Sequence, residues 1–351
     1  MNLLYKLIGI VILLASVVTV WFWHSYTQYQ DRPTHFSGGD KVFVIEKGSA
    51  ISTVVRQLIA EGIILDRSRF MWMINNNEKA RNIQAGEFII SPDMTPKQIL
   101  TNFIKGKVKQ HSFTVVEGWS FKQMITAISG SDKLKHTLKN KTSKEIMAIL
   151  GYADEHPEGR FLPDTYYFPA GMSDKLFLQR AYKAMENVLE KYWKKRDKSL
   201  PFTTPYEALI LASIVEKETG VAREREQISG VFVRRLKKKM RLQTDPTVIY
   251  GLGDKYDGNL RKRDLKNDTP YNTYRRKGLP PTPIALPGAA AIKAALHPAS
   301  GETLYFVAKG DGSHYFSATV QEHNTAVRKY QLRGRKKNYR SAPEVKETVD
   351  K

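Results

Sequence analysis

The longest apolar stretch of the chain lies close to its N-terminus. From Leu7 to Trp23 the sequence LIGIVILLASVVTVWFW contains no charged residue. A run of this length is at the lower limit for a transmembrane helix, and Trp21 and Trp23 suit the membrane–water interface. Lys6 and the N-terminal amine precede the run, which predicts a cytoplasmic N-terminus. We therefore expect residues 1–26 to be a single-pass anchor in the inner membrane of a Gram-negative cell, with the following chain in the periplasm.

A cleaved signal peptide is the alternative interpretation of this run. Signal peptides usually have a shorter apolar region that ends in a small-x-small cleavage site. Here the run ends in Trp21-Phe22-Trp23-His24, which offers no such site. The pattern therefore favours a retained anchor.

Extended and helical patterns alternate after the anchor. In order, we expect a polar linker over 27–39, a strand over Lys41–Ile45, a helix from Ser49, a helix over Arg67–Asn75 and a strand over Glu87–Ile90. The first helix is indicated by apolar residues at helical spacing: Ile51, Val54, Val55 and Leu58. The order strand, helix, helix, strand resembles that of glycan-binding LysM domains. Residues 40–110 are therefore predicted to form a LysM-like α+β module.

A second α+β region is predicted for residues 111–200. It opens with Val115-Val116-Glu117-Gly118, which partly repeats Val44-Ile45-Glu46-Lys47-Gly48 and hints at a duplication. Phe161 to Pro169 is predicted to be a rigid loop, and Leu176 to Trp193 a long amphipathic helix. The fold class expected for the whole chain is α+β: an N-terminal transmembrane helix, the LysM-like module, then a mixed α/β domain with its core over 201–332. A basic tail follows at 333–351.

The helix expected from Thr204 to Glu218 carries the first sign of chemistry. Thr204 as N-cap, Pro205 after it and Glu207 three residues beyond the cap are a clear start signal, and Gly220 is expected to close the helix. The middle of the helix is apolar on almost every side, which predicts a central position. Its buried stripe is defined by Ala208, Leu211, Ala212 and Val215.

Glu218 extends that stripe, whereas Glu216 points to another face. Burial and the negative end of the helix dipole both raise the pKa of such a carboxyl group. A glutamic acid that stays protonated near neutral pH can donate a proton to a glycosidic oxygen. A structural glutamate paired with Lys or Arg is the other interpretation that the spacing allows.

Composition narrows the possible functions. The chain has no cysteine, which excludes disulfides, thiol nucleophiles and cysteine-based zinc sites. Its eight histidines show no metal-ligand spacing, so we expect no metal and no cofactor. The formal net charge of +21 fits nucleic acid, anionic lipid or an anionic wall polymer. An extracytoplasmic body disfavours nucleic acid, and no nucleic-acid-binding motif is present.

A series of motifs gives the chain a family resemblance. They are PDTY at Pro163–Tyr166, SIVEKE at Ser213–Glu218, LQTDPTVIYG at Leu242–Gly251, PYNTY at Pro270–Tyr274, GLPPTPI at Gly278–Ile284 and HPASGETLYFVAKGDGSHYFS at His297–Ser317. Together they resemble the YceG-like (MltG) endolytic murein transglycosylases over all of the chain except the tail. The resemblance implies that Glu218 is the catalytic residue. It also implies that the substrate cleft is lined by Gln243, Thr244, Asp245, Asn272, Thr273, Tyr274, Asp164 and His314.

The resemblance implies a lyase that cuts within peptidoglycan glycan strands. Such an enzyme leaves 1,6-anhydro ends on N-acetylmuramic acid (MurNAc), ends the growth of nascent strands and works beside cell-wall synthases such as penicillin-binding proteins. Two alternatives stay open. A second carboxylate from Glu158, Asp164 or Asp245 would make the enzyme a hydrolase with two acids. A non-catalytic, membrane-tethered protein could instead bind glycan through the LysM-like module.

Overall fold

The structure is a computed structural model that describes residues 2–332, so the basic tail expected at 333–351 lies outside the described residues. The α-helices are α1 (Asn2–Asp31), α2 (Ile51–Ala60), α3 (Arg67–Asn75), α4 (Pro96–Lys105), α5 (Phe121–Ser129), α6 (Ser143–Leu150), α7 (Asp174–Lys194), α8 (Pro205–Glu218), α9 (Arg225–Lys237), α10 (Asp245–Leu252), α11 (Lys262–Lys266), α12 (Ala289–Leu296) and α13 (Val320–Val327). Shorter helical turns are η1 (Glu78–Asn82), η2 (Ala222–Glu224), η3 (Gly253–Lys255) and η4 (Arg328–Leu332).

The strands of residues 2–332 pair in twos. They are β1 (Lys41–Ile45), β2 (Gly86–Ile90), β3 (Gln110–Thr114), β4 (Leu134–Lys135), β5 (Thr165–Pro169), β6 (Met172–Ser173), β7 (Tyr305–Ala308) and β8 (His314–Ser317). The pairs are β1 with β2, β3 with β5, β4 with β6 and β7 with β8. The class is therefore α+β, as expected. Part of the loop predicted over Phe161–Pro169 is the strand β5, because Tyr166 and Phe168 alternate inward with the exposed Thr165 and Tyr167.

The described residues divide into two compact units, the first of residues 2–112 and 167–172, the second of 113–166 and 173–332. In the first unit, β1 and β2 pair antiparallel, with Lys41 opposite Ile90 and Ile45 opposite Gly86. Helices α2, α3 and α4 cover one apolar core, in which Phe43, Phe88 and Phe103 are almost fully buried. The predicted order strand, helix, helix, strand is confirmed.

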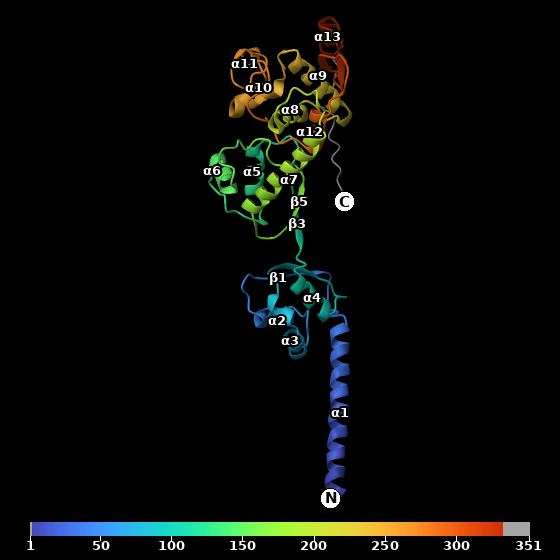
Figure 1. The fold of residues 1–351 in the computed structure, drawn as a ribbon. Coiled ribbons are helices and arrows are strands. Elements are labelled where there is room, and N and C mark those ends of the chain that lie inside the picture. Colours follow the sequence, from blue (N-terminus) through green and yellow to red (C-terminus); the bar gives the residue numbers. More distant parts are fainter. Residues whose placement is uncertain (1, 333–351) are drawn as a thin grey trace. The chain divides into compact units, whose positions relative to one another are not determined.

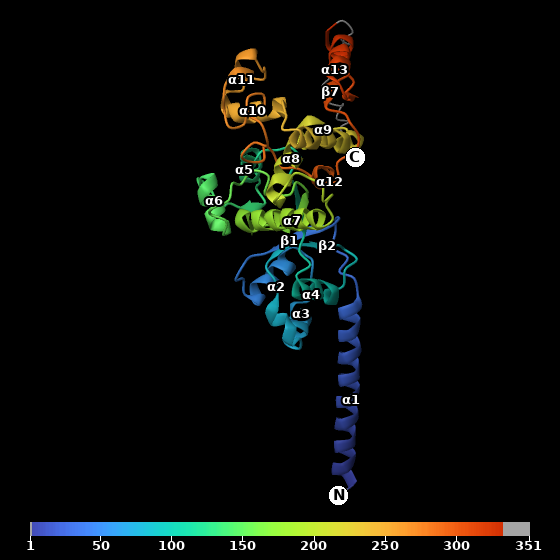
Figure 2. The same ribbon diagram turned by 45° about the horizontal axis from the view of Figure 1, so that its top comes forward.

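Helix α1 of the first unit is longer than expected (Figures 1 and 2). It continues to Asp31, so the linker expected from residue 27 begins only after Asp31. The cause is packing, because the buried Tyr26 ring lies 4.1 Å from the Trp72 ring of α3. Among the described residues, one helix is long and apolar enough to cross a membrane: Leu3–Asp31, with a mean hydropathy of 2.4 over its most apolar window.

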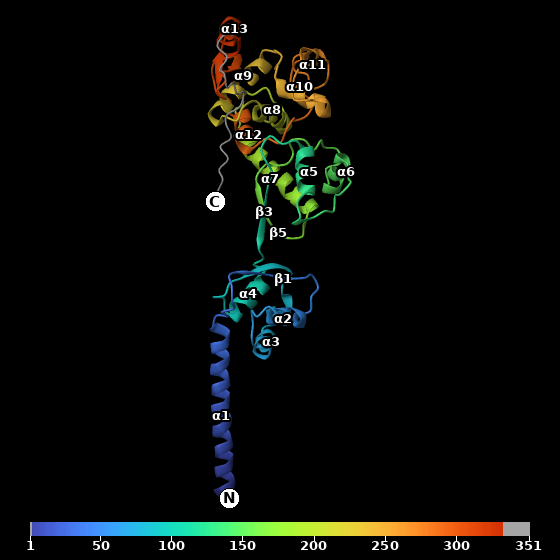
Figure 3. The ribbon, with the colours of Figure 1, turned by 180° about the vertical axis from the view of Figure 1, so that it is seen from behind.

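The second unit is built around α8 (Figure 3), whose neighbours are α7, α9, α10 and α12. Residues Ala208 to Val215 are all buried, which confirms the predicted central position. The boundary expected between residues 200 and 201 is absent, because Leu189 of α7 and Phe202 belong to the same apolar core as Leu209. The unit is also less rich in strands than a mixed α/β domain, since its sheets have two strands each.

Candidate active site

Helix α8 ends at the residue singled out by the sequence. At its start, the Thr204 hydroxyl oxygen accepts from the Glu207 N–H at 3.3 Å and the Glu207 carboxylate accepts from the Thr204 N–H at 3.0 Å. This reciprocal cap was predicted. The helix ends at Glu218, and Thr219 follows with extended backbone angles. The expected role of Gly220 in closing the helix is therefore wrong, since the chain has left the helix one residue earlier.

Glu218 is partly buried and contacts the segment that precedes α10. The Thr244 hydroxyl donates a hydrogen bond to Oε1 of Glu218. Burial raises the pKa of Glu218 to about 7, the Thr244 hydrogen bond and the charge of Arg235 lower it, and the nearby Asp245 carboxylate raises it. Loss of hydration is the largest of these effects, as expected from the apolar stripe. Near neutral pH the group can therefore release and accept a proton.

Two other threonines hold Thr244, the partner of Glu218, in place. The Thr244 N–H donates to Thr273 Oγ1 at 3.1 Å, and Thr247 Oγ1 donates to the Thr244 carbonyl at 2.8 Å. The hydroxyl oxygens of Thr247 and Thr273 lie 2.9 Å apart. All three side chains are buried. The structure therefore joins the two motifs that contain Thr244 and Thr273, which were predicted to line one cleft.

Asp245 and Tyr274 form a second pair beside Glu218. The Tyr274 hydroxyl donates to Asp245 Oδ1 at 2.6 Å, and burial together with this carboxylate raises the pKa of Tyr274. Asp245 is exposed, and so is Gln243, whose backbone lies in the left-handed region with φ of 52°. The Gln243 N–H donates to the Thr273 carbonyl at 3.2 Å. Both side chains are therefore accessible next to the buried threonines.

Arg235 of α9 is a site residue that the sequence analysis missed. Its side chain is buried, and it donates to the carbonyl oxygens of Leu304 and Leu242 at 2.7 Å each. It thus fixes the segment that leads to Thr244, and its charge lowers the pKa of Glu218. A signal was present, because Arg235 follows Ile228 and Phe232 at helical spacing on the buried face of α9.

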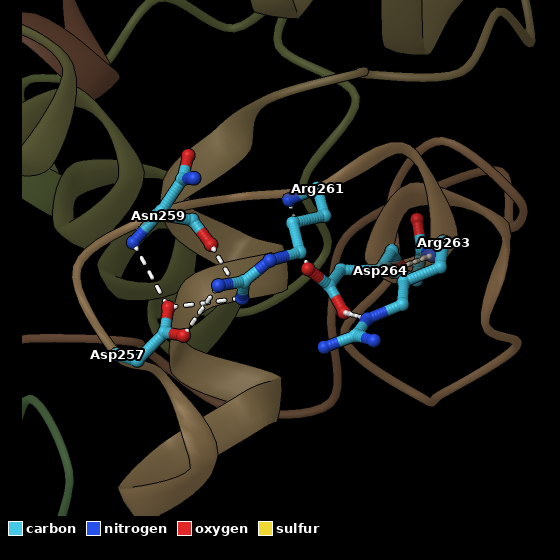
Figure 4. Close-up of polar contacts among 6 residues, drawn as sticks. Asp257, Asn259, Arg261, Arg263 and Asp264 are labelled. Carbon is cyan, nitrogen blue, oxygen red and sulfur yellow. Dashed lines mark hydrogen bonds and ion pairs between the residues drawn. The ribbon is translucent and has the colours of Figure 1, made fainter.

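Asn272 has a structural role rather than an open position in the site. It is buried, and its amide donates to the carbonyls of Leu265 at 3.1 Å and Asn267 at 2.5 Å. These carbonyls follow directly on the segment labelled in Figure 4, in which Arg261 binds Asp257 at 2.6 Å and Arg263 approaches Asp264 at 3.8 Å. Asn272 therefore joins α11 to the neighbouring Thr273 and Tyr274.

Three other residues were predicted to line the cleft or to supply a second carboxylate, and each has contacts of its own. Asp164 is exposed at the start of β5 and accepts from the Thr165 N–H at 2.7 Å. His314 is buried on β8, with Nδ1 2.8 Å from the buried Glu224 carboxylate. Glu158 is buried and accepts from the Phe121 N–H at 2.9 Å and the Tyr250 hydroxyl at 3.1 Å. No described contact joins any of the three to Glu218.

Glu216 points away from Glu218, as expected, but it is not a surface residue. Its side chain is 5% exposed, accepts from the Gly288 N–H at 2.9 Å and lies 3.5 Å from the Arg225 guanidinium. Burial raises the pKa of Glu216 as well. Glu216 thus ties α8 to the segment before α12, and a substitution there would disturb packing. Glu216 is therefore unsuitable as a control position for substitutions of Glu218.

Comparison with known proteins gives the family. The YceG-like family matches residues 43–329. The chain belongs to the YceG-like family. The match includes every residue of the candidate site, from Asp164 to His314.

Named relatives and a solved structure agree with this YceG-like assignment. A protein of Bacillus subtilis named endolytic murein transglycosylase is 33% identical over 82% of this chain and 83% of its own length. A Streptococcus pneumoniae protein of the same name is 26% identical over 70% of this chain and 50% of its own length. The crystal structure of a YceG-like protein from Listeria monocytogenes is 32% identical, with a TM-score of 0.50 over 82% of this chain and 99% of that one.

Asp245 is expected to organise substrate without serving as nucleophile or base. Asp245→Asn keeps an acceptor for the Tyr274 hydroxyl, so the variant should retain measurable activity and release the same product as the wild type. The charge of Asp245 raises the pKa of Glu218, and the neutral amide does not. The pH above which activity falls should therefore be lower in the variant. The measurement is product analysis across pH. Complete inactivity with an intact fold would make Asp245 a second catalytic carboxylate.

Proposed function

We propose that this protein is an endolytic peptidoglycan lytic transglycosylase with Glu218 as the single acid and base. The observation that carries the proposal is a carboxyl group at the end of a buried helix, with a pKa of about 7 and a hydroxyl donor on one oxygen. Its place in the YceG-like family and the names of its relatives support the same activity.

In the first step, protonated Glu218 donates to the oxygen that joins MurNAc to N-acetylglucosamine (GlcNAc). The glycosidic bond breaks and an oxocarbenium-like sugar develops on MurNAc. In the second step, the Glu218 carboxylate removes the proton from the C6 hydroxyl of the same MurNAc, whose oxygen closes on C1. A 1,6-anhydro end forms, no water is consumed and Glu218 recovers its proton.

The neighbours of Glu218 suit these two steps. The Thr244 hydrogen bond and the Arg235 charge stabilise the carboxylate that exists between them, while burial and Asp245 favour the protonated form. The opposing effects leave the pKa near the working pH, which suits a group that must both give and take a proton. Gln243 and Asp245 are exposed beside it and are the side chains we assign to sugar positioning.

A steep pH dependence is expected. Because the first step needs protonated Glu218, kcat/KM should fall about tenfold per pH unit above a pKa of about 7. Glu158 has a similar pKa, raised to about 7 by burial. The matched control is therefore Glu158→Gln, whose remaining activity should show the same fall. A profile that stays flat up to pH 9 would contradict the role given to Glu218.

The products of the purified full chain test the proposal. Digests of glycan strands should contain fragments that are lighter by one water than those with reducing ends. Fragments cut within strands, rather than disaccharides released from an end, would show endolytic cleavage. Binding to strands without any fragments would favour the alternative, a tethered glycan-binding protein.

We also propose that α1 anchors the chain in the inner membrane, with a cytoplasmic N-terminus and a periplasmic body. A fusion of a reporter that fluoresces only in the cytoplasm to the C-terminus should then stay dark. The matched control carries the reporter after the cytoplasmic N-terminus and should be bright. A bright C-terminal fusion would overturn the topology.

The first unit is proposed to be LysM-like and to bring the enzyme to glycan. Its strand, helix, helix, strand order supports this assignment. We also propose that the enzyme releases nascent strands beside cell-wall synthases, with penicillin-binding proteins as its partners. Crosslinking in growing cells tests that association.

A further inference from the structure

The end of α1 packs firmly on the first unit at the point where the apolar run stops. The Phe22 ring lies 5.9 Å from the Trp72 ring of α3, and the Tyr26 ring lies 4.1 Å from it. The Arg69 guanidinium donates to Ser25 Oγ at 3.0 Å. The position of α3 relative to the apolar helix is therefore fixed by direct contacts.

These contacts set the depth of α3 if α1 spans a membrane. Trp21 and Trp23 are exposed and suit the interface. At about 1.5 Å per helical residue, Tyr26 and Gln30 lie roughly 4 and 10 Å beyond Trp23. The polar layer of one leaflet is about 5–8 Å thick, because the bilayer measures about 30 Å without headgroups and 40–45 Å with them. The turn of α1 that contacts α3 through Tyr26 is therefore at headgroup depth, and Gln30 lies just beyond the headgroups.

A cavity of about 570 Å³ opens at the outer edge of this headgroup layer. Tyr26 and Gln30 line it on the side of α1, and the other walls come from the end of α3, η1 and α4. The polar groups of those walls include two lysines and several amide or hydroxyl groups, namely Lys79, Lys97, Asn76, Asn77 and Thr101. Glu78 also lines the cavity, and Lys97 Nζ lies 3.7 Å from Asp31 Oδ1.

We propose that this cavity binds the phosphate headgroup of an anionic membrane lipid. The inference rests on the proposed membrane anchor. Lysine ammonium groups bind phosphate as point charges, and amide groups can donate to its oxygens. An anionic membrane surface attracts basic side chains within a Debye length, which is where α1 places Lys79 and Lys97. A bound lipid would give the first unit a second attachment to the membrane beside α1.

Depth measurements on the full chain in lipid nanodiscs test the proposal. Because the chain has no cysteine, single labels can be placed by substitution. Asn75→Cys places a fluorophore at the end of α3 beside the cavity. Val44→Cys on the exposed side of β1 is the control, since Figure 1 shows β1 on the opposite side of this unit from α3. Leu13→Cys reports on the middle of α1.

A nitroxide on lipid headgroups should quench the label at Asn75→Cys but not the label at Val44→Cys. A nitroxide deep in the acyl chains should quench Leu13→Cys. An unquenched Leu13→Cys label would overturn the anchor itself. If Leu13→Cys is quenched, the anchor stands. If the headgroup nitroxide then quenches Asn75→Cys and Val44→Cys equally, the lipid site alone is overturned.

Lipid charge gives the second readout. With the nitroxide carried on the phosphatidylglycerol headgroup, replacing phosphatidylcholine by this labelled lipid should increase quenching at Asn75→Cys as the cavity fills. Each lysine near an anionic surface contributes about fivefold in affinity. Lys79→Gln combined with Lys97→Gln should therefore shift the midpoint of that titration up to about 25-fold. The matched double variant Lys47→Gln with Lys107→Gln removes two exposed charges outside the cavity and should leave the midpoint unchanged. Equal shifts in both variants would contradict a specific site.

Discussion

Glu218→Gln is expected to lower the rate of glycan cleavage by about 10²–10⁴-fold, towards the upper end or beyond, because one group serves both proton transfers. The amide keeps the size of the carboxyl group and can still accept from the Thr244 hydroxyl, but it cannot deliver a proton. The measurement is the initial rate of release of anhydro-ended fragments at pH 6–7.

The control for this variant is Glu302→Gln, an exposed glutamate in the loop before β7, which should retain full activity. Glu216 would be a poor control because it is buried against Gly288 and Arg225. If Glu218→Gln keeps near-wild-type activity, the catalytic assignment fails.

The same substitution should stabilise the fold at neutral pH. The folded protein keeps the Glu218 proton up to a pKa of about 7, whereas the unfolded chain loses it near its ordinary value of about 4.5. The wild type therefore loses stability as pH rises from about 4.5 to 7, by about 1.4 kcal/mol per unit of pKa difference at most. Glu218→Gln should unfold at a higher temperature than the wild type at pH 8 and at the same temperature at pH 4.

Arg235→Met is expected to have the second large effect. It removes donors from the carbonyls of Leu304 and Leu242, and buried carbonyls without partners cost about 1–3 kcal/mol each. The free energy of unfolding should fall by about 2–6 kcal/mol. Loss of the positive charge should also raise the pKa of Glu218, so the fall in activity should move to higher pH.

The neighbouring Arg234 provides the matched control for that variant. Arg234 also donates to half-buried backbone carbonyls, those of Thr303 at 2.7 Å and Ala299 at 2.9 Å, but it is not among the groups that shift the pKa of Glu218. Arg234→Met should lose comparable stability and leave the pH profile in place. Equal shifts of the profile in the two variants would show that Arg235 acts only through the fold.

The sequence predicted α8 and the position of Glu218 at its end, because the signals there are local. The Thr204 cap and the apolar stripe lie within one helix, and so does the position of Glu218 at its end. Glu218 was also the residue that the family resemblance implied. The strands β1 and β2 were predicted for the same reason, since short alternating runs need no distant partner to be recognised.

The rest of the site depends on contacts between distant segments. Arg235 contacts Leu242 and Leu304 only in the folded chain. Asn272 is buried through its contact with Leu265, which the residues around Asn272 do not indicate. The extension of α1 to Asp31 comes from the contact of Tyr26 with Trp72. The polar residues after Trp23 gave no sign of this contact. His314 was expected in the cleft, whereas the structure pairs it with Glu224.

The most direct test of the account is cleavage of glycan strands in water enriched in oxygen-18, with products read by mass spectrometry. If Glu218 acts alone through the C6 hydroxyl, wild-type products should be 1,6-anhydro fragments without the heavy isotope, and Glu218→Gln should release almost none. Fragments with reducing ends that carry oxygen-18 would contradict the account, because water would then be the attacking group and a second carboxylate would be required.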